Sequence, residues 1–487
     1  MTAASNRIMG DVPRVNATTA AEAIGDNDVV LVSGFGSVGY PKAVPTALSE
    51  TDRNLSLTIV SGGSVGPEID EELVERAMIA RRFPYQSQSA STAAANEGTV
   101  QYHDRHLSRV GDEARTGYYG SPDVALVEAI AVGEDWFVPS TSIGQVPAFV
   151  SAADRLIVEL NETVPGGVER FHDVYRRSLP PDRTALPLSN PGDRIGSPRV
   201  EFDPNALVGV VPSSHRDTPY EFRSPTVTDD AIAENLLEFL SEEVDRNPAF
   251  DRRLVLQFGV GSVGNALMEA VQSAELPIDE IAYYGEVIQD GLLDALDSGA
   301  ISTASATSLA LSADGTDRLF ADVDRYADRI VLRNTSVSNS PGLIERFGVL
   351  SMNTVAEIDV YGHANVTHID GSRLLNGIGG GGDFTRNSLL GIVVLASTTR
   401  DGDISRIKPM VPHVDYTEHD LSIVVTEQGV ADLRGLSPRE RAETIVDSCA
   451  HPSYRDDLRA YLERAHTGGG HIPHDLETVF SRHDADS

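Results

Sequence analysis

The chain has few of the residues that disulfides, metal clusters and membrane spans require. It holds one cysteine among 487 residues, Cys449, which excludes an intramolecular disulfide and any multi-cysteine zinc or iron–sulfur site. The histidines form no metal-binding pattern such as HExxH. Apolar runs stay below the roughly 18 residues that a transmembrane helix needs, and residues 1–15 lack a signal-peptide pattern. We therefore expect a cytoplasmic protein with no membrane partner and no metal site.

Lysine is nearly absent as well. Only Lys42 and Lys408 occur, so arginine supplies almost all of the 39 basic residues, against 73 acidic residues and a net charge of −34. Without a basic footprint, the chain is not expected to bind nucleic acid. An ordinary acidic protein is one explanation. The shortage of lysine instead favours a halophilic protein in molar salt, where the Debye length is about 3 Å and dense surface acid repels little.

Short apolar runs bounded by glycine, proline or aspartate recur along the chain, with helical patterns between them. This alternation predicts an α/β fold with parallel sheets. Helices are expected over residues 41–48 and from about Leu292. The predicted strands are residues 29–32, 57–60, 124–127, 156–160, 207–211, 254–258, 281–284, 330–332, 392–395 and 422–425.

A polar segment with three prolines, residues 212–230, divides the chain almost in half. It has no apolar period, which is typical of a linker. We therefore predict an N-terminal α/β domain over residues 1–212, a linker over residues 213–230 and a C-terminal α/β domain over residues 231–487. The C-terminal domain would carry the candidate site residues described below.

The two halves echo each other in sequence. VSGFGSVGYPKAV (residues 32–44) resembles LQFGVGSVGNA (residues 256–266), and DRLIVELNE (154–162) resembles DLSIVVTEQ (420–428). Each echo is short, but their common order predicts duplication of an α/β unit. We expect two similar open parallel-sheet domains with the active site in a cleft between them.

Two glycine-rich segments are candidates for ligand contact. Residues 259–264, GVGSVG, follow a predicted strand and fit GxGxxG, but the acidic residue that a dinucleotide fold requires is not cleanly placed. Their backbone N–H groups suit an anion or oxyanion, and a plain tight turn is the alternative. Residues 377–382, GIGGGG, lie between apolar segments, which favours close approach of backbone to a ligand.

Charged residues accompany these glycines. Glu286 follows the predicted strand at residues 281–284, and catalytic groups gather at such strand ends. From position alone, a surface carboxylate or a helix N-terminal charge explains it as well. Arg386, Arg400, Arg406 and Lys408 form a positive group near the glycine loop. These cations either pair with neighbouring acids or hold phosphate.

Longer segments resemble a known family. They are SGFGSVGYPKAVP (residues 33–45), GEVIQDG (285–291), SNSP (338–341), MNTVAEIDVYGHANVTHIDGSRLLNGIGGGGDFTRN (352–387) and HVDYTEHDLSIVVTEQGVADLRGLSPRERA (413–442). Through them the chain resembles the acetyl-CoA hydrolase/transferase family of class I CoA-transferases, and most of all the succinyl-CoA:acetate CoA-transferases. The resemblance implies the CoA-transferase fold and covers nearly the whole chain.

The resemblance also implies roles for particular residues. Glu286 matches the catalytic glutamate, and Asn339 matches an asparagine at the reacting end of CoA. The positions that contact CoA or form an oxyanion hole match Gly259, Val260, Gly261, Ser262, Val263, Asn376, Gly380 and Arg400. Two positions depart from the family pattern, because Gly285 replaces a threonine and Gly381 replaces a serine.

The implied activity is transfer of CoA between a short-chain acyl-CoA and a carboxylic acid, such as succinyl-CoA and acetate. The route is ping-pong, through a glutamyl-CoA thioester. No cofactor is implied, because coenzyme A and acyl-CoA are substrates, and we expect a homodimer. One alternative is an acetyl-CoA hydrolase that uses the same anhydride intermediate. The other is a CoA-sensing or structural protein without turnover.

Overall fold

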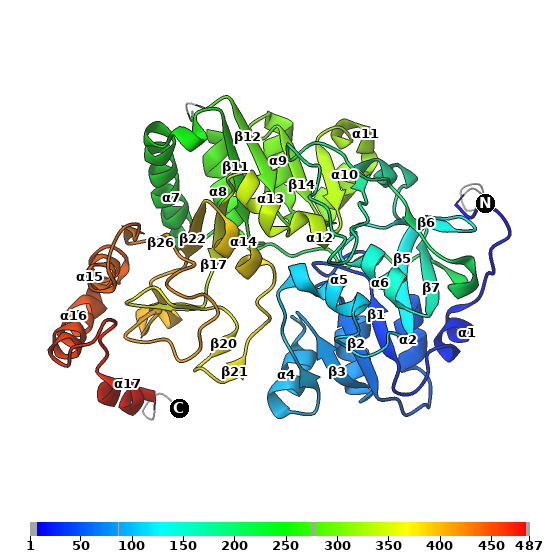
Figure 1. The fold of residues 1–487 in the computed structure, drawn as a ribbon, viewed down its shortest axis with the longest axis horizontal. Helices are drawn as coiled ribbons and strands as arrows, with labels where there is room; N and C mark the ends of the chain where they lie inside the picture. The colour runs from blue at the N-terminus through cyan, green and yellow to red at the C-terminus, as the bar shows by residue number, and fades with distance from the viewer. Residues whose placement is uncertain (1–6, 86, 274–275, 277, 484–487) are drawn as a thin grey trace. The chain divides into compact units, whose positions relative to one another are not determined.

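The chain folds into two compact units, each built from several segments (Figure 1). The structure, a computed structural model, describes residues 7–483 except residues 86, 274–275 and 277. Unit 1 takes the chain up to Glu221, Tyr283–Leu296 and Ser302–Leu343; unit 2 takes Phe222–Ala282, Asp297–Ile301 and the chain from Ile344. Glu286 thus belongs to the same unit as the N-terminal sequence. The division into residues 1–212, 213–230 and 231–487 stays a prediction.

The main sheet of unit 1 is parallel. Its strand order is β10-β7-β5-β1-β2-β3-β4, with every neighbouring pair parallel. The strands are β1 (Val29–Val32), β2 (Leu57–Ser61), β3 (Ile79–Phe83), β4 (Gln101–Tyr102), β5 (Val124–Val132), β7 (Arg155–Asn161) and β10 (Leu207–Ser213). β6 (Trp136–Pro139) and β9 (Val200–Glu201) extend it as antiparallel strands. All four residues of β1 are buried, as expected for a strand covered on both faces.

A second parallel group in unit 1 has the order β14-β16-β8. The smaller pair β13 and β15 is also parallel. These strands are β8 (His172–Asp173), β13 (Val287–Ile288), β14 (Thr303–Ala306), β15 (Ser308–Leu309) and β16 (Ile330–Arg333). The helices are α1 (Ala17–Glu22), α2 (Ala43–Ser49), α3 (Leu73–Glu75), α4 (Ser89–Glu97), α5 (Leu107–Arg115), α6 (Val146–Ala152), α9 (Asp290–Ser298), α10 (Ala313–Ala321), α11 (Val323–Tyr326), α12 (Thr335–Ser338) and α13 (Pro341–Arg346). The last residues of α9 and of α13 are assigned to unit 2.

Unit 2 is built on the strand order β27-β26-β22-β17-β11, in which only the β26–β27 pair is antiparallel. β12 (Glu280–Tyr284) carries the chain from unit 2 into unit 1. The other strands are β11 (Arg253–Phe258), β17 (Leu350–Thr354), β18 (Glu357–Asp359), β19 (Ala364–Asn365), β20 (His368–Ile369), β21 (Arg373–Leu374), β22 (Leu390–Val394), β23 (Thr398–Thr399), β24 (Ile404–Ser405), β25 (Ile407–Lys408), β26 (Ile423–Thr426) and β27 (Gly429–Asp432). The helices are α7 (Val227–Arg246), α8 (Ser262–Ser273), α14 (Gly381–Asn387), α15 (Pro438–Cys449), α16 (Pro452–Thr467) and α17 (Leu476–His483).

The predicted α/β fold class is confirmed, and each predicted strand overlaps an observed one. The first sequence echo also has a structural counterpart. β1 and β11 each precede a glycine turn and a helix, and each pairs in parallel with a neighbouring strand. The second echo does not occupy equivalent places, because β7 is two strands from β1 whereas β26 is three strands from β11.

One of the two lysines anchors the turn after β1. Lys42 is 2% exposed, and its Nζ lies 2.8 Å from Glu128 and 2.7 Å from Asp217. The Glu159 carboxylate accepts hydrogen bonds from the first backbone N–H groups of α2, at 3.0–3.2 Å. Asp217 lies within the predicted linker, so part of that polar segment is held against unit 1.

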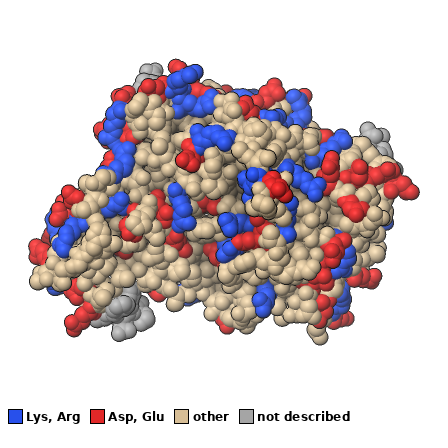
Figure 2. Space-filling model, viewed as in Figure 1, with Lys and Arg blue, Asp and Glu red and all other residues tan. Residues whose placement is uncertain are grey.

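The remaining global predictions concern burial and charge. Cys449 is buried, as expected, and burial raises the pKa of its thiol to about 12. Within the described residues, no helix is long and apolar enough to span a bilayer. Acidic side chains are spread over many elements with basic side chains among them (Figure 2). Adaptation to concentrated salt stays a prediction.

Candidate functional site

Glu286 occupies a fixed turn between β12 and β13. The Gly285 N–H donates to the Ser305 carbonyl at 2.9 Å. The Glu286 carbonyl accepts from the N–H groups of Thr307 and Ser308, at 2.8 and 3.1 Å. Backbone contacts on both sides of the residue therefore set the direction in which its side chain leaves the sheet.

Asn339 holds the carboxylate of Glu286. It is the residue that ends α12, and its Nδ2 donates to Glu286 Oε1 at 2.6 Å. Ser338 Oγ donates to Asn339 Oδ1 at 2.8 Å, which leaves the amide N–H2 to face the carboxylate. Asn339 is fully buried, so this is a charge-assisted contact in a region of low dielectric constant.

The surroundings of Glu286 in unit 1 are aromatic. Burial raises the pKa of Tyr85 to about 12, with contributions from the Asp104 and Glu286 carboxylates. Burial and Glu286 also raise the pKa of Tyr283. Both hydroxyls therefore stay neutral near pH 7. Val287 belongs to an apolar cluster that includes Phe35, with Tyr85 packed against it, which limits the space for water beside the carboxylate.

The structure accounts for both departures from the family pattern. A Cβ added at Gly285 would lie 2.3 Å from the Tyr283 hydroxyl oxygen, and one added at Gly381 would lie 2.3 Å from the Tyr416 hydroxyl oxygen. A threonine or serine cannot fit unless the tyrosine moves. Tyr283 OH donates to the Val287 carbonyl at 3.1 Å, so it braces the segment that carries Glu286.

The first predicted CoA-contacting segment lies in unit 2, at the end of β11. Gly259, Val260, Gly261, Ser262 and Val263 form the turn into α8. Val260 is 42% exposed, and a Cβ added at Gly261 would meet no atom within 4 Å. The turn borders a small pocket whose lining includes Gly259 and Val263 beside the apolar side chains of Leu236, Phe258, Met352 and Val394.

The glycine loop of unit 2 meets this turn at Asn353, a residue that the sequence did not single out. Asn353 Oδ1 lies 3.9 Å from a Cβ added at Gly259 and 3.5 Å from one added at Gly381. Gly380 is the N-cap of α14. Asn376 lies at the start of the loop. When its side-chain amide is oriented to satisfy its hydrogen bonds, the amide nitrogen donates to the carbonyls of Val366 and Gly377. Asn353 is a buried polar residue inside a strand, which is the signal that could have identified it.

Most of the predicted positive group has structural partners. Arg386 pairs with Asp420 at 3.0 Å, Arg406 donates to the Val355 and Ala356 carbonyls, and Lys408 lies 4.0 Å from Glu357. Arg400 is exposed and has a left-handed φ of 51°. Of these four cations, Arg400 is the one whose side chain makes no hydrogen bond or ion pair within the part of the chain that the structure describes. The structure thus brings Glu286 and Asn339 together in unit 1, and the other predicted residues belong to unit 2.

Comparison with sequence families matches most of the chain. The family model for the acetyl-CoA hydrolase/transferase N-terminal domain matches residues 13–212, and the model for the C-terminal domain matches residues 315–462. The chain is 40% identical over 475 residues to a succinyl-CoA:acetate CoA-transferase of Clostridium kluyveri, covering 96% of this chain and 88% of the relative.

Two further relatives differ in the activity that they are named for. The chain is 40% identical to a propanoyl-CoA:succinate CoA transferase of Escherichia coli, covering 96% of each. It is 39% identical to an acetyl-CoA hydrolase of Saccharomyces cerevisiae, covering 93% of this chain and 89% of the relative.

Solved structures support the fold. RipA from Yersinia pestis matches with a TM-score of 0.72 at 20% identity, covering 93% of this chain and 97% of RipA. A 4-hydroxybutyrate CoA-transferase from Porphyromonas gingivalis matches with a TM-score of 0.65 at 18% identity, covering 93% and 97%. At these identities, the two likenesses concern the fold.

Proposed function

Because the chain belongs to the acetyl-CoA hydrolase/transferase family, we propose that it transfers CoA between a short-chain acyl-CoA and a carboxylic acid, with Glu286 as nucleophile. The observation that carries this proposal is the 2.6 Å hydrogen bond from Asn339 to the Glu286 carboxylate. A buried amide that orients a carboxylate at a strand end is suited to covalent catalysis.

In the proposed reaction, Glu286 first accepts an acyl group from CoA and later returns an acyl group to CoA. The carboxylate attacks the thioester carbonyl, the C–S bond breaks, and an acyl-glutamyl anhydride and CoA thiolate result. The thiolate then attacks the glutamyl carbonyl, which releases the first carboxylic acid as carboxylate and leaves a glutamyl-CoA thioester. An incoming carboxylate reverses the two steps and departs as the new acyl-CoA.

Asn339 has two tasks in this scheme. It holds one oxygen of Glu286 so that the other can attack, and its N–H group can then donate to the oxygen that becomes negative in the tetrahedral intermediate. Loss of a single oxyanion donor typically lowers kcat by about 10²–10³. The proposal assigns further hydrogen-bond donors to CoA and to the thioester carbonyl. They are the backbone N–H groups of the turn at residues 259–263 and of Gly380.

The identity of the acceptor separates transferase from hydrolase. Relatives named for both activities are about 40% identical to this chain. We favour transfer, with succinyl-CoA and acetate as the first pair to test. The aromatic surroundings of Glu286 limit water, and a well-oriented acid gains a large effective concentration.

The direct test traps Glu286. Wild-type protein is incubated with acyl-CoA without an acceptor, treated with borohydride and mapped by mass spectrometry. The mark should fall on residues 285–291. Glu286→Ala should lower turnover by about 10⁴ and abolish the mark, while Glu234→Ala, an exposed change on α7, should leave both unaltered. A mark on any other peptide contradicts the assignment.

The second test measures the acceptor. Acetate should stimulate consumption of succinyl-CoA, with stoichiometric acetyl-CoA and parallel lines in double-reciprocal plots. If succinyl-CoA disappears equally fast without acetate, the chain is a hydrolase that uses the same anhydride.

A further inference from the structure

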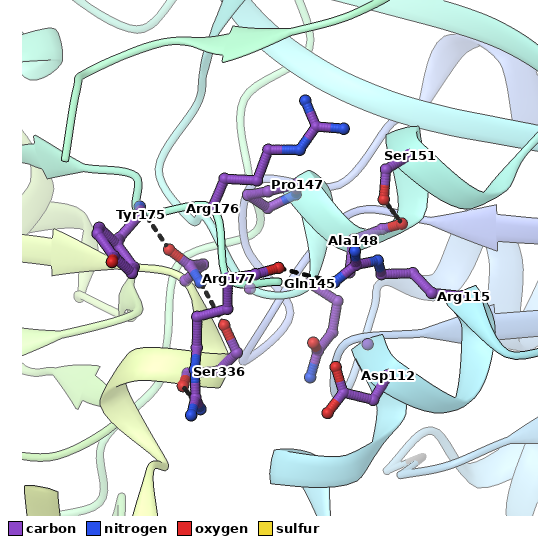
Figure 3. A pocket seen from close by; sticks show the side chains of 13 residues that line it. Asp112, Arg115, Gln145, Pro147, Ala148, Ser151, Tyr175, Arg176, Arg177 and Ser336 are labelled. Carbon is purple, nitrogen blue, oxygen red and sulfur yellow. Dashed lines mark hydrogen bonds between the residues drawn. The ribbon is translucent and has the colours of Figure 1, made fainter. Parts of the chain in front are cut away.

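Unit 1 contains a pocket rich in arginine that the proposed reaction does not use (Figure 3). Arg115 at the end of α5 lines one side, and Arg176 and Arg177, in the segment after β8, line another. Figure 3 shows Arg177 extending toward Ser336 and Arg176 extending the opposite way. Of the described residues that line the pocket, Asp112 is the only acid.

The positive charge of this pocket is not neutralised. Asp112 already pairs with Arg183 at 2.7 Å, and no carboxylate ion pair to Arg115, Arg176 or Arg177 is found among the described residues. Arg115 donates instead to the Arg177 carbonyl at 2.9 Å. In a chain of net charge −34, three arginines that share a pocket without a direct carboxylate ion pair create a locally positive potential.

Arg177 also has an unused donor. Its Nη1 donates to the Ser336 carbonyl at 3.0 Å, but its buried Nε has no hydrogen-bond partner among the described residues. Burial and the nearby Arg183 charge lower the pKa of Arg177, and burial followed by Arg176 and Arg183 lowers the pKa of Arg115 despite Asp112. A bound anion would reverse both effects, because it would stabilise the charged guanidinium groups.

The pocket is linked to Glu286 through α12. Asn334 and Ser336, at the start of this four-residue helix, line the pocket, and the residue that ends the helix, Asn339, donates to Glu286. Gly144, another lining residue, accepts from the Thr335 N–H and donates to Thr307 Oγ1, and the Thr307 N–H donates to the Glu286 carbonyl. Each of these two hydrogen-bonded connections between the pocket and Glu286 involves few residues and is buried.

We propose that the arginine pocket binds a small oxyanion, a phosphate or a carboxylate, and that the bound anion steadies α12 and hence the Asn339–Glu286 pair. Planar guanidinium forks match such oxygens in geometry as well as charge. Free phosphate, a substrate carboxylate or a phosphate group of CoA would each supply this chemistry. The effect on Glu286 rests on the proposed function, whereas the binding itself does not.

Calorimetric titration at constant ionic strength tests the binding, with inorganic phosphate, acetate and adenosine 3′,5′-diphosphate as separate probes. At least one should bind wild type at a single site. Arg115→Gln should weaken that binding about tenfold or more. Arg176→Gln should weaken it too. It provides a second variant because the Arg176 side chain is exposed and makes no hydrogen bond or ion pair with the described residues. The control is Arg170→Gln, an exposed arginine of unit 1 that pairs with Asp324.

The probe that binds identifies the source of the oxyanion. If none of the three binds, or if binding is unchanged in both pocket variants, the site is refuted. Turnover tests the link to α12. It is measured with and without the bound probe at saturating acyl-CoA and acceptor acid, with an acceptor other than acetate if acetate is the probe. The probe should raise kcat of wild type and of Arg170→Gln but not of Arg115→Gln, and unchanged wild-type kcat at saturation refutes the link. If no turnover exists at all, the proposed function fails while the titration still decides the site.

Discussion

The molecule contains two glycine turns of nearly the same sequence, and they differ in what covers them. In the first glycine turn, residues 34–39, the Gly39 N–H donates to Asp217 at 3.1 Å and the Gly36 carbonyl accepts from Tyr220 OH at 2.9 Å. The second glycine turn, residues 259–264, exposes Val260 and leaves open space beside Gly261. Both precede a helix whose first N–H groups attract negative charge.

The difference shows that a motif acquires its chemistry from its surroundings. In unit 1 the chain satisfies the helix itself, because Glu159 caps α2 and Lys42 balances the carboxylates around it. In unit 2 the corresponding turn exposes Val260 and leaves open space beside Gly261, so it is suited to an external anion. We therefore interpret the first turn as structural and the second as functional.

The largest effect should come from removing the lysine of the first turn. Lys42→Met leaves the buried Glu128 and the partly buried Asp217 without their cation, so the free energy of unfolding should fall by about 3–5 kcal/mol. Lys408→Met is the matched control, because that lysine is 30% exposed and 4.0 Å from its acidic partner, and it should change stability by less than about 0.5 kcal/mol. Urea unfolding measures both, and equal losses would contradict the structural interpretation.

A slightly smaller loss is expected when the first turn is overpacked. A Cβ at Gly39 would lie 2.6 Å from the Ser142 backbone nitrogen, at a φ of +66°. Gly39→Ala should cost about 2–4 kcal/mol, from backbone strain together with the clash. Gly98 also has a positive φ, but a Cβ added there would meet no atom within 4 Å. Gly98→Ala therefore measures the backbone strain alone, at about 1–2 kcal/mol. A Gly39 variant no less stable than the Gly98 variant would show that the turn is loosely packed.

The carboxylate beside Lys42 should make stability depend on pH. Burial raises the pKa of Glu128 from 4.5 to about 7, although Lys42 opposes the shift. Between these values the folded state keeps a proton that the unfolded state releases, so the free energy of unfolding falls as pH rises from 4.5 to 7. The expected fall is on the order of 1–3 kcal/mol. Glu128→Gln should flatten that part of the profile, and a wild-type profile that rises throughout the window would contradict the assignment.

The smallest effect on stability should come from the second turn. A Cβ at Gly259 meets only Asn353 Oδ1, at 3.9 Å, so Gly259→Ala should change the free energy of unfolding by less than about 0.5 kcal/mol. The methyl group would nevertheless occupy the space that the proposed CoA approaches, and KM for acyl-CoA should rise about tenfold. Unaltered kinetics would remove this turn from the binding site.

Much of the fold could be predicted because the central strands are buried on both faces. β1 is a continuous apolar run, and β5 and β11 each contain one, at residues 124–127 and 254–256, which signals a strand without knowledge of its partners. β3 escaped prediction because it contains Arg82, a buried arginine that pairs with Asp70 at 2.7 Å. β14 escaped because its sequence, TASA, has no large apolar residue.

The candidate site, like the fold, could be predicted only in part. Glu286 could be located from its strand end and family motif, but its partner Asn339 is 53 residues away, and only the fold brings the two together. The proline-containing segment near Asp217 has no apolar period, because single polar contacts rather than a packed face hold it in place. The arginine pocket combines elements far apart in the sequence, so no local sequence pattern predicts it.

The scarcity of lysine has a chemical consequence for a family that handles activated acyl groups. A neutral amine attacks thioesters and anhydrides, whereas an ammonium group does not. Burial alone would lower the pKa of Lys42, but Asp217 and Glu128 raise it above its ordinary value and keep the group protonated. Lys408 is the only other side-chain amine in the sequence. Acyl-CoA can slowly acylate the side-chain amines of a protein. In this chain that side reaction therefore has a single accessible side-chain amine as its target, Lys408.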